Sequence, residues 1–221
     1  MSTSRSFVAT IVLVILYAVG AVGVGGLGRV DLMDLTPINL LLTWGFLLWT
    51  HRPPRNSLWI FVLSVYVIGM LAEIVGVQTG LLFGDYAYGP ILGWKVWETP
   101  LMIGINWIIV TYAAGCTINA LYHALGQDLS IGRIDIVPKQ LLAKAVLTTL
   151  SMTLLDVFIE PDAMQYGMWN WANGVVPIHN YLGWLFVGFL TALLFHYLLP
   201  RTRNRIGVLV FGLQLLFFLI I

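Results

Sequence analysis

The sequence is poor in charged residues. Asp, Glu, Lys and Arg make up only 10% of its 221 residues, whereas soluble domains carry about 25%. Hydrophobic residues make up 59%, and the mean hydropathy is +0.90. This composition predicts an integral membrane protein and excludes an ordinary soluble enzyme. The formal net charge of +1 offers no broadly basic surface, so no nucleic-acid partner is expected.

Cysteine and the common cofactor motifs are also scarce. The single cysteine, Cys116, excludes an internal disulfide. The four histidines are scattered without metal-ligand spacing, so no metal site is expected. The nucleotide and acyl-transfer motifs GxxxxGKS/T, GxGxxG and GxSxG do not occur, and neither does a DDxxD run for a metal-bound diphosphate. The last apolar segment, 205–221, has no lysine for a retinal Schiff base. We therefore predict no cofactor.

Long apolar runs are what the sequence has instead. A membrane-spanning helix needs about 20 predominantly apolar residues, and the chain offers about seven such segments. They cover residues 6–27, 36–50, 57–82, 99–122, 139–160, 178–199 and 205–221. The predicted fold is all-α, a polytopic transmembrane helical bundle forming one membrane domain over residues 1–221. The run that begins at Phe7 is long enough to remain as a helix, so no cleaved signal peptide is expected.

Basic residues are concentrated in alternate loops. One set of loops contains Arg5, Arg52, Arg55, Arg133, Lys139, Lys144, Arg201, Arg203 and Arg205, and the other set contains only Arg29 and Lys95. The positive-inside rule assigns the first set to the cytoplasm. It predicts a cytoplasmic N-terminus in the cell's inner membrane, and it places the aromatic loops 84–98 and 161–177 on the opposite side.

Glycines predict how the third helix packs. Gly76, Gly80 and Gly84 recur every four residues, which is typical of a small-residue stripe on one helix face. Glu73 lies just before this stripe, so we expect its side chain to face protein and not lipid. The stripe permits a dimer without requiring one.

Two prolines mark the starts of helices. Pro100 and Pro177 lie where the missing N–H of proline costs nothing, and Thr99 is predicted as the N-cap before Pro100. Trp107 and Trp184 each follow one of these prolines by seven residues. The shared interval is compatible with internal duplication.

Three acids within the apolar segments are the candidate catalytic groups. Acids in a membrane span are costly and usually face a bundle interior or a water-filled cavity. Glu73 lies in the third helix, and Asp156 and Glu160 share one face of the fifth at a spacing of four. Two acids this close compete for one proton, which favours a carboxylic acid able to donate it. The simpler alternative is that each acid only makes an interhelical hydrogen bond.

Aromatic residues crowd the two loops that follow these acids. Tyr and Trp commonly form anchoring belts at membrane interfaces, but a belt does not explain why this enrichment is one-sided. Ring faces near buried acids can also stabilise a carbocation by cation–π attraction. The predicted substrate-binding residues are Tyr86, Tyr88, Trp94, Trp107, Trp169, Trp171, His179, Asn180 and Trp184.

The sequence segments that contain these residues resemble one known family. The segments are EIVGVQTGLLFGDYAY (73–88), Pro100 with Trp107, DVFIEPDA (156–163), WNW (169–171) and PIHNYLGW (177–184). In this order and spacing they span about half of the chain. They resemble the membrane carotenoid hydratases, a group that includes carotenoid 1,2-hydratases and bisanhydrobacterioruberin hydratases. The flanking helices match that group only in hydrophobicity.

The resemblance implies addition of water, without a cofactor, to the terminal C1–C2 double bond of an acyclic (ψ) carotenoid end. The expected substrate is lycopene- or γ-carotene-like. One buried acid would protonate C2, leaving a tertiary cation at C1, and a carboxylate would deprotonate the attacking water. Glu73 and Asp156 are the expected pair, with either residue as the acid. The loop aromatics would shield the cation, and His179 or Asn180 would hold the water.

Two other functions remain open from the sequence. Protonation followed by proton loss, without water capture, would make the protein a carotenoid end-group isomerase or cyclase. Alternatively, the protein binds or transports carotenoids without catalysis, and its buried acids are structural or carry protons.

Overall fold

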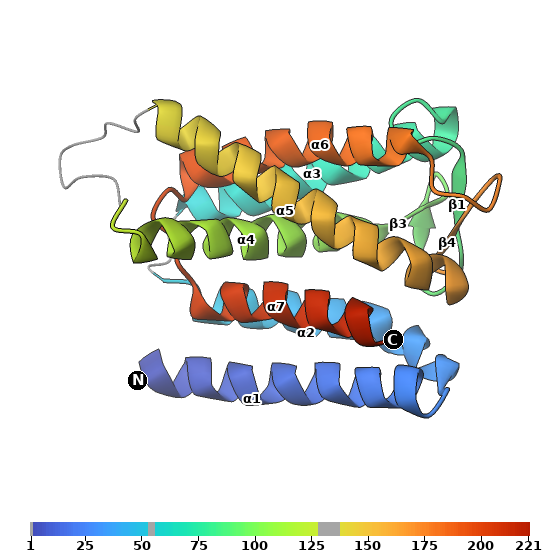
Figure 1. The fold of residues 1–221 in the computed structure, drawn as a ribbon, viewed down its shortest axis with the longest axis horizontal. Coiled ribbons are helices and arrows are strands. Elements are labelled where there is room, and N and C mark those ends of the chain that lie inside the picture. Colours follow the sequence, from blue (N-terminus) through green and yellow to red (C-terminus); the bar gives the residue numbers. More distant parts are fainter. Residues whose placement is uncertain (1, 53–55, 128–137) are drawn as a thin grey trace.

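The computed structural model describes residues 2–52, 56–127 and 138–221. Within these ranges the chain forms seven α-helices that run alongside one another (Figure 1). They are α1 (Ser2–Ala21), α2 (Thr36–Thr50), α3 (Asn56–Thr79), α4 (Leu101–Ala124), α5 (Pro138–Gln165), α6 (Ile178–Leu198) and α7 (Arg205–Ile220). Arg55 and Arg133, which contributed to the predicted orientation, lie outside the described residues.

Short elements fill the connections. A π-helix (Val22–Gly26) extends α1, and a 3-10 helix (Val30–Leu35) precedes α2. The strands are β1 (Tyr86–Tyr88), β2 (Lys95–Val96), β3 (Thr99–Pro100) and β4 (Trp169–Trp171). In the described part of the chain, six helical segments are long and apolar enough to cross a membrane, and α7 is a shorter apolar helix. The protein is therefore an all-α, multi-pass membrane protein with six to seven spans, which confirms the predicted fold class.

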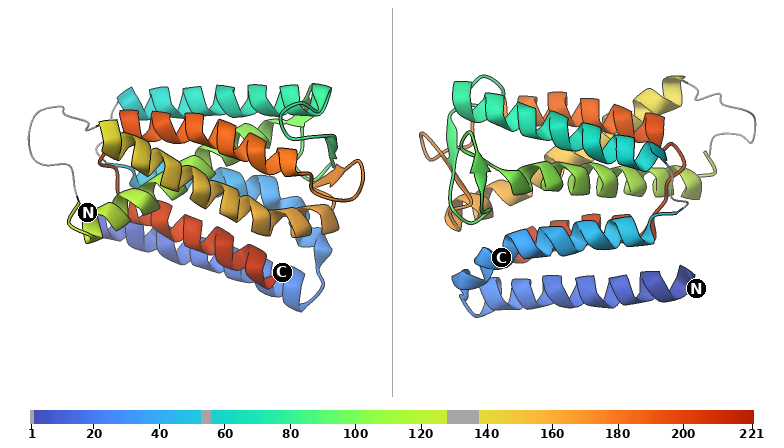
Figure 2. Two further views of the ribbon diagram at one scale, coloured as in Figure 1. Left: turned by 45° about the horizontal axis from the view of Figure 1, so that its top comes forward. Right: turned by 180° about the vertical axis from the view of Figure 1, so that it is seen from behind.

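Helix α4 occupies the centre of the bundle. It contacts α2, α3, α5, α6 and α7, with α1, α2 and α7 on one side and α3 and α6 on the other (Figures 1 and 2). Small residues on α4 allow this close approach. A Cβ at Gly104 would lie 2.6 Å from the Tyr66 ring, and one at Gly115 would collide with Phe195. Small side chains let helix backbones approach closely, which is a major source of helix–helix packing in lipid.

Two helical hairpins are related by an approximate two-fold arrangement. One hairpin is α3–β1–α4 and the other is α5–β4–α6. Strand β1 pairs antiparallel with β4, α3 also contacts α6, and α4 also contacts α5. Exchanging the two hairpins turns the α3–α6 contact into the α4–α5 contact and leaves the β1–β4 pairing unchanged. The arrangement agrees with the internal duplication that the proline–tryptophan interval indicated, and it brings both aromatic loops to one end of the bundle.

The predicted glycine stripe was wrong. Helix α3 ends at Thr79, and Gly80 and Gly84 have positive φ angles of 68° and 101°. Glycine adopts this left-handed conformation without steric cost, and it commonly terminates helices. Of the three glycines of the predicted stripe, only Gly76 therefore lies on the helix. The related expectation for Glu73 is confirmed, because its side chain is buried within the protein.

Two other helix boundaries differ from prediction. Helix α5 continues beyond Glu160 and through Pro161 to Gln165, so the following loop is shorter than expected. The N-cap of α4 is Pro100 and not Thr99. Thr99 instead pairs with Val96 in the β2–β3 hairpin, which holds it in the strand.

Candidate active site

Strands β1 and β4 direct four aromatic rings into the end of the bundle. Their register pairs Tyr86 with Trp171 and Tyr88 with Trp169, with one intervening residue on each strand. Side chains alternate between the two faces of a strand, so the four rings share one face. The intervening residues are exposed on the other. The Tyr86 and Trp171 rings lie 5.0 Å apart, and those of Tyr88 and Trp169 lie 6.0 Å apart.

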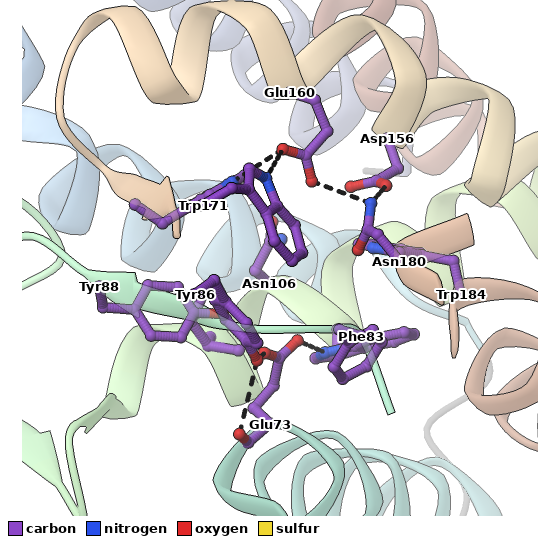
Figure 3. Close-up of a pocket in the computed structure, with 13 residues that line it drawn as sticks. Glu73, Phe83, Tyr86, Tyr88, Asn106, Asp156, Glu160, Trp171, Asn180 and Trp184 are labelled. Atoms are coloured by element: carbon purple, nitrogen blue, oxygen red, sulfur yellow. Dashed lines mark hydrogen bonds between the residues drawn. The ribbon is translucent and has the colours of Figure 1, made fainter. Parts of the chain in front are cut away.

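Glu73 lies beneath this sheet and accepts three hydrogen bonds (Figure 3). The hydroxyls of Tyr86 and Tyr88 donate to Oε2 at 2.6 and 2.7 Å, and Trp107 Nε1 donates to Oε1 at 2.9 Å. Glu73 is 6% exposed. All three partners are donors, a set that suits an ionised carboxylate because this group only accepts.

The two tyrosines keep their protons in this environment. Burial raises the pKa of the Tyr86 and Tyr88 hydroxyls well above the ordinary tyrosine range, and the charge of Glu73 acts in the same direction. Both phenols therefore remain hydrogen-bond donors to Glu73 at neutral pH.

Asp156 and Glu160 lie across from Glu73 and are linked by one amide (Figure 3). Asn180 Nδ2 donates to Asp156 Oδ2 at 2.8 Å and to Glu160 Oε1 at 3.0 Å. The indole N–H groups of Trp169 and Trp171 donate to Glu160 Oε2 at 3.0 and 2.8 Å. Asp156, Glu160 and Asn180 are all at most 2% exposed. Glu160 thus accepts hydrogen bonds from three side chains, whereas Asp156 accepts one from Asn180.

The three acids line one small cavity, which we call the acid cavity. Its lining is Glu73, Phe83, Tyr86, Tyr88, Ile103, Asn106, Trp107, Asp156, Glu160, Trp169, Trp171, Asn180 and Trp184. Its volume is about 30 Å³, and about 10–15 Å³ is enough for one water molecule. The cavity therefore has room for about two waters among acids and aromatic rings. Such a site can transfer protons and stabilise a cation.

Comparison with known proteins places the chain in a family. Residues 34–221 match the family model described as "Carotenoid biosynthesis protein". The chain belongs to the carotenoid biosynthesis protein family. Its sequence is also 30% identical over 156 residues to the bisanhydrobacterioruberin hydratase of Haloarcula japonica. That match covers 68% of this chain and 48% of the hydratase, so the chain spans about half the length of this curated relative. No solved structure matches the chain.

In this carotenoid biosynthesis protein, the cavity gathers ten of the twelve residues predicted from the sequence. Trp94 and His179 do not belong to it. Trp94 is 87% exposed in the loop after β1. His179 is also exposed, because neighbouring residues on a helix point about 100° apart and the adjacent Asn180 takes the inward direction. The structure therefore does not bring these two predicted residues together with the other ten.

Three lining residues were missed by the sequence reasoning: Phe83, Ile103 and Asn106. Asn106 is a polar residue in an apolar helix, so the rule that singled out the acids would also have found it. Phe83 and Ile103 resemble ordinary core residues, and no local signal distinguishes them. Among the described residues, no group of three or more His, Cys, Asp and Glu side chains could hold a metal ion.

Proposed function

We propose that this protein is a cofactor-independent hydratase that adds water to the terminal C1–C2 double bond of an acyclic carotenoid end. The substrate would be lycopene- or γ-carotene-like, and the enzyme would act in the cell's inner membrane. One observation carries the proposal: three buried carboxyl groups surround a ring-lined cavity large enough for water. Membership of the carotenoid biosynthesis family and similarity to a hydratase support it.

Asp156 is the proton donor in this proposal. Two ionised carboxylates bridged by a single amide would repel strongly at low dielectric, so the Asp156–Glu160 pair retains one proton. Three hydrogen-bond donors hold Glu160 as the carboxylate, which leaves the proton on Asp156. Transfer of this proton to C2 of the substrate forms the new C–H bond and leaves a tertiary cation at C1.

The cation at C1 is stabilised by the cavity walls. The rings of Tyr86 and Trp171 are in contact and both line the cavity, and electron-rich ring faces attract cations. The carboxylate of Glu73 adds an opposite charge from the other hairpin. Because these groups are already positioned and buried, little reorganisation is needed when the charge develops.

Water then attacks C1, and Glu73 accepts its released proton. A protonated tertiary alcohol is a strong acid, so even a well-stabilised carboxylate is basic enough to deprotonate it. The product is a tertiary alcohol. Glu73 gains one proton and Asp156 loses one, so the total number of protons on the protein is unchanged. Water in the shared cavity would return that proton to Asp156 for the next turnover.

The acid cavity must widen to admit the substrate. A cavity of about 150 Å³ is known to bind benzene, which has six carbons, whereas the acid cavity measures about 30 Å³. The branched end of a carotenoid is of similar bulk to benzene. The β1–β4 sheet covers the acids, and each of its strands is attached to the helices through loops, so we propose that β1 and β4 separate to admit the substrate.

The test is product analysis in membranes of a lycopene-producing host that expresses this chain. Chromatography and mass spectrometry should reveal a more polar pigment that is one water heavier, and growth in heavy-oxygen water should label it. A new pigment with the mass of lycopene would instead identify an isomerase or cyclase. Unchanged lycopene that co-purifies with the protein would support the binding or transport alternative and contradict hydration.

A further inference from the structure

A second cavity lies beside the acid cavity, and we call it the side cavity. It is formed where α1, α2 and α7 meet α4, α5 and β4, and its volume is about 90 Å³. Ile103, Asn106 and Trp169 line both cavities. The two spaces are therefore neighbours that share part of one wall.

The side cavity contains polar groups that the proposed chemistry does not use. Its polar lining residues are Tyr17, Thr36, Asn39, Asn106 and Gln214. Gln214 is 5% exposed and lies in the middle of the apolar helix α7. An amide in such a position is costly unless its polar atoms find partners.

Two oxygens of this lining are buried without a partner. Asn39 Oδ1 and Gln214 Oε1 accept no hydrogen bond from any residue that the structure describes. Nearly all buried polar atoms in proteins are paired with protein or water, so these oxygens require a donor. A polyene is a hydrocarbon with no donor to offer, whereas water offers two.

We propose that the side cavity is a water-binding site that supplies the water added in the acid cavity. This inference rests on the proposed hydration and identifies the source of its second substrate. At about 10–15 Å³ for each water, the side cavity holds several molecules. Asn106 belongs to both linings, and its amide can both donate and accept as water passes.

A separate supply is needed because the acid cavity is small. Its volume of about 30 Å³ does not accommodate a carotenoid end and water together without widening. The entering hydrocarbon displaces the waters that were there, and the surrounding lipid provides none. Water arriving from the side cavity captures the cation before a proton is lost, so this cavity decides between hydration and isomerisation.

Radiolytic footprinting tests whether the side cavity is wet, without any reference to catalysis. X-ray pulses convert bound water into hydroxyl radicals that oxidise adjacent side chains. Met33 and Met168 line the side cavity and are 3% and 4% exposed, whereas Met152 is 0% exposed and lines neither cavity. We expect oxidation of Met33 and Met168 several-fold above Met152, and a decrease in the Asn39→Leu, Gln214→Leu double variant.

Two footprinting results would overturn the water site. The first is that Met33 and Met168 are as protected as Met152 in the unmodified protein. The second is that bound lycopene protects both methionines, because the polyene itself would then occupy the side cavity. Either result stands whether or not the protein hydrates carotenoids.

The product ratio tests whether this water is used. Gln214→Leu should lower the ratio of hydrated to isomerised product by roughly threefold to tenfold, the effect of one lost hydrogen bond. Gln140→Leu is the matched control. Gln140 Oε1 is also buried without a partner among the described residues, but it lies roughly 30 Å along α5 from Glu160.

The outcomes of the two experiments are distinguishable. An unchanged product ratio in Gln214→Leu, with a melting temperature like that of the control, would overturn the supply role. If the unmodified protein forms no hydrated product, the proposed function fails, and footprinting still decides whether the side cavity binds water.

Discussion

Trp107 and Trp184 stack against each other, with ring centroids 4.4 Å apart and planes inclined by 23°. Each tryptophan lies seven residues after the proline that caps its helix. The two are therefore equivalent residues of the two hairpins, and their contact lies near the approximate two-fold axis that relates the hairpins. The acids on either side of this stack are not equivalent. Glu73 is held by two phenols and an indole, whereas Glu160 is held by two indoles and an amide. An approximately symmetric scaffold therefore carries carboxyl groups in asymmetric surroundings.

Neutral variants of the two central acids test their roles. Glu73→Gln and Asp156→Asn preserve shape but can neither accept the proton from water nor donate one to C2. Each should lower the rate of product formation by roughly 10²–10⁴-fold, measured as hydrated pigment per unit of membrane protein. Glu98→Gln is the control, because the Glu98 side chain is 75% exposed and lies outside the cavity. Full activity in both central variants would disprove the assignment.

The hydroxyl of Tyr86 should matter more than its ring. Tyr86→Phe keeps the tilted ring contact with Trp171 but removes the 2.6 Å hydrogen bond to Glu73. Hydrogen bonds to charged groups contribute about 1.5–3 kcal/mol, so we expect a decrease in kcat of roughly tenfold to a hundredfold, with pigment binding retained. Tyr197→Phe, at a residue that is 62% exposed, should be silent. An unchanged kcat in Tyr86→Phe would show that this hydrogen bond does not serve the reaction.

Gly76 provides the space in which Tyr86 reaches Glu73. A Cβ at residue 76 would lie 2.7 Å from the Phe83 ring and 2.9 Å from the Tyr86 hydroxyl. Gly76→Ala should therefore displace Tyr86 and lower activity about as much as Tyr86→Phe. Gly45→Ala meets nothing within 4 Å and should leave activity unchanged, with equal or higher thermal stability because alanine favours helix. Equal behaviour of the two variants in activity assays and thermal melts would contradict this steric account.

A reversible crosslink tests whether β1 and β4 must separate to admit the substrate. Gly89 N–H donates to the Met168 carbonyl, and because hydrogen-bonded pairs alternate along a ladder, Ala87 and Asn170 form such a pair. Their Cα atoms should lie about 5.5 Å apart, a separation that a disulfide spans. Both residues are exposed on the face away from the acids, and the native Cys116 is buried.

The double variant Ala87→Cys, Asn170→Cys should lose hydration activity when oxidised and recover it after reduction. Each single variant, treated identically, is the control and should be active under both conditions. Mass spectrometry would verify the crosslink. A fully crosslinked protein that retains its rate would show that substrate enters without separation of β1 from β4.

The orientation predicted from loop charge is tested by labelling. If the N-terminus is cytoplasmic, a cysteine replacing the exposed Ala87 should react in intact cells with a maleimide that cannot cross the membrane. A cysteine replacing the exposed Gln127, just after α4 at the other end of the bundle, should react only after the cells are permeabilised. The opposite pattern would reverse the topology.

The sequence by itself determined the class of the protein and its candidate catalytic acids. Scarce charge and long apolar runs indicate a helical membrane bundle. Lipid offers no hydrogen-bond partners, so the backbone N–H and C=O groups of a spanning segment must pair within a helix. Glu73 and Asp156 were identifiable because an acid in such a helix is too costly to be placed without a partner or a function. These are local properties, which composition and spacing report directly.

The tertiary structure alone decided which groups meet. Asp156 precedes Trp169 by the same thirteen residues that separate Glu73 from Tyr86. From this spacing alone, Trp169 would be expected to bond Asp156 as Tyr86 bonds Glu73. Helix α5 instead continues to Gln165, which shortens the loop and brings Glu160 to the indoles. The lengths of α3 and α5 depend on packing against distant helices, and such contacts leave no local signal in the sequence. For the same reason only the fold distinguished Trp94 at the surface from the rings around the acids.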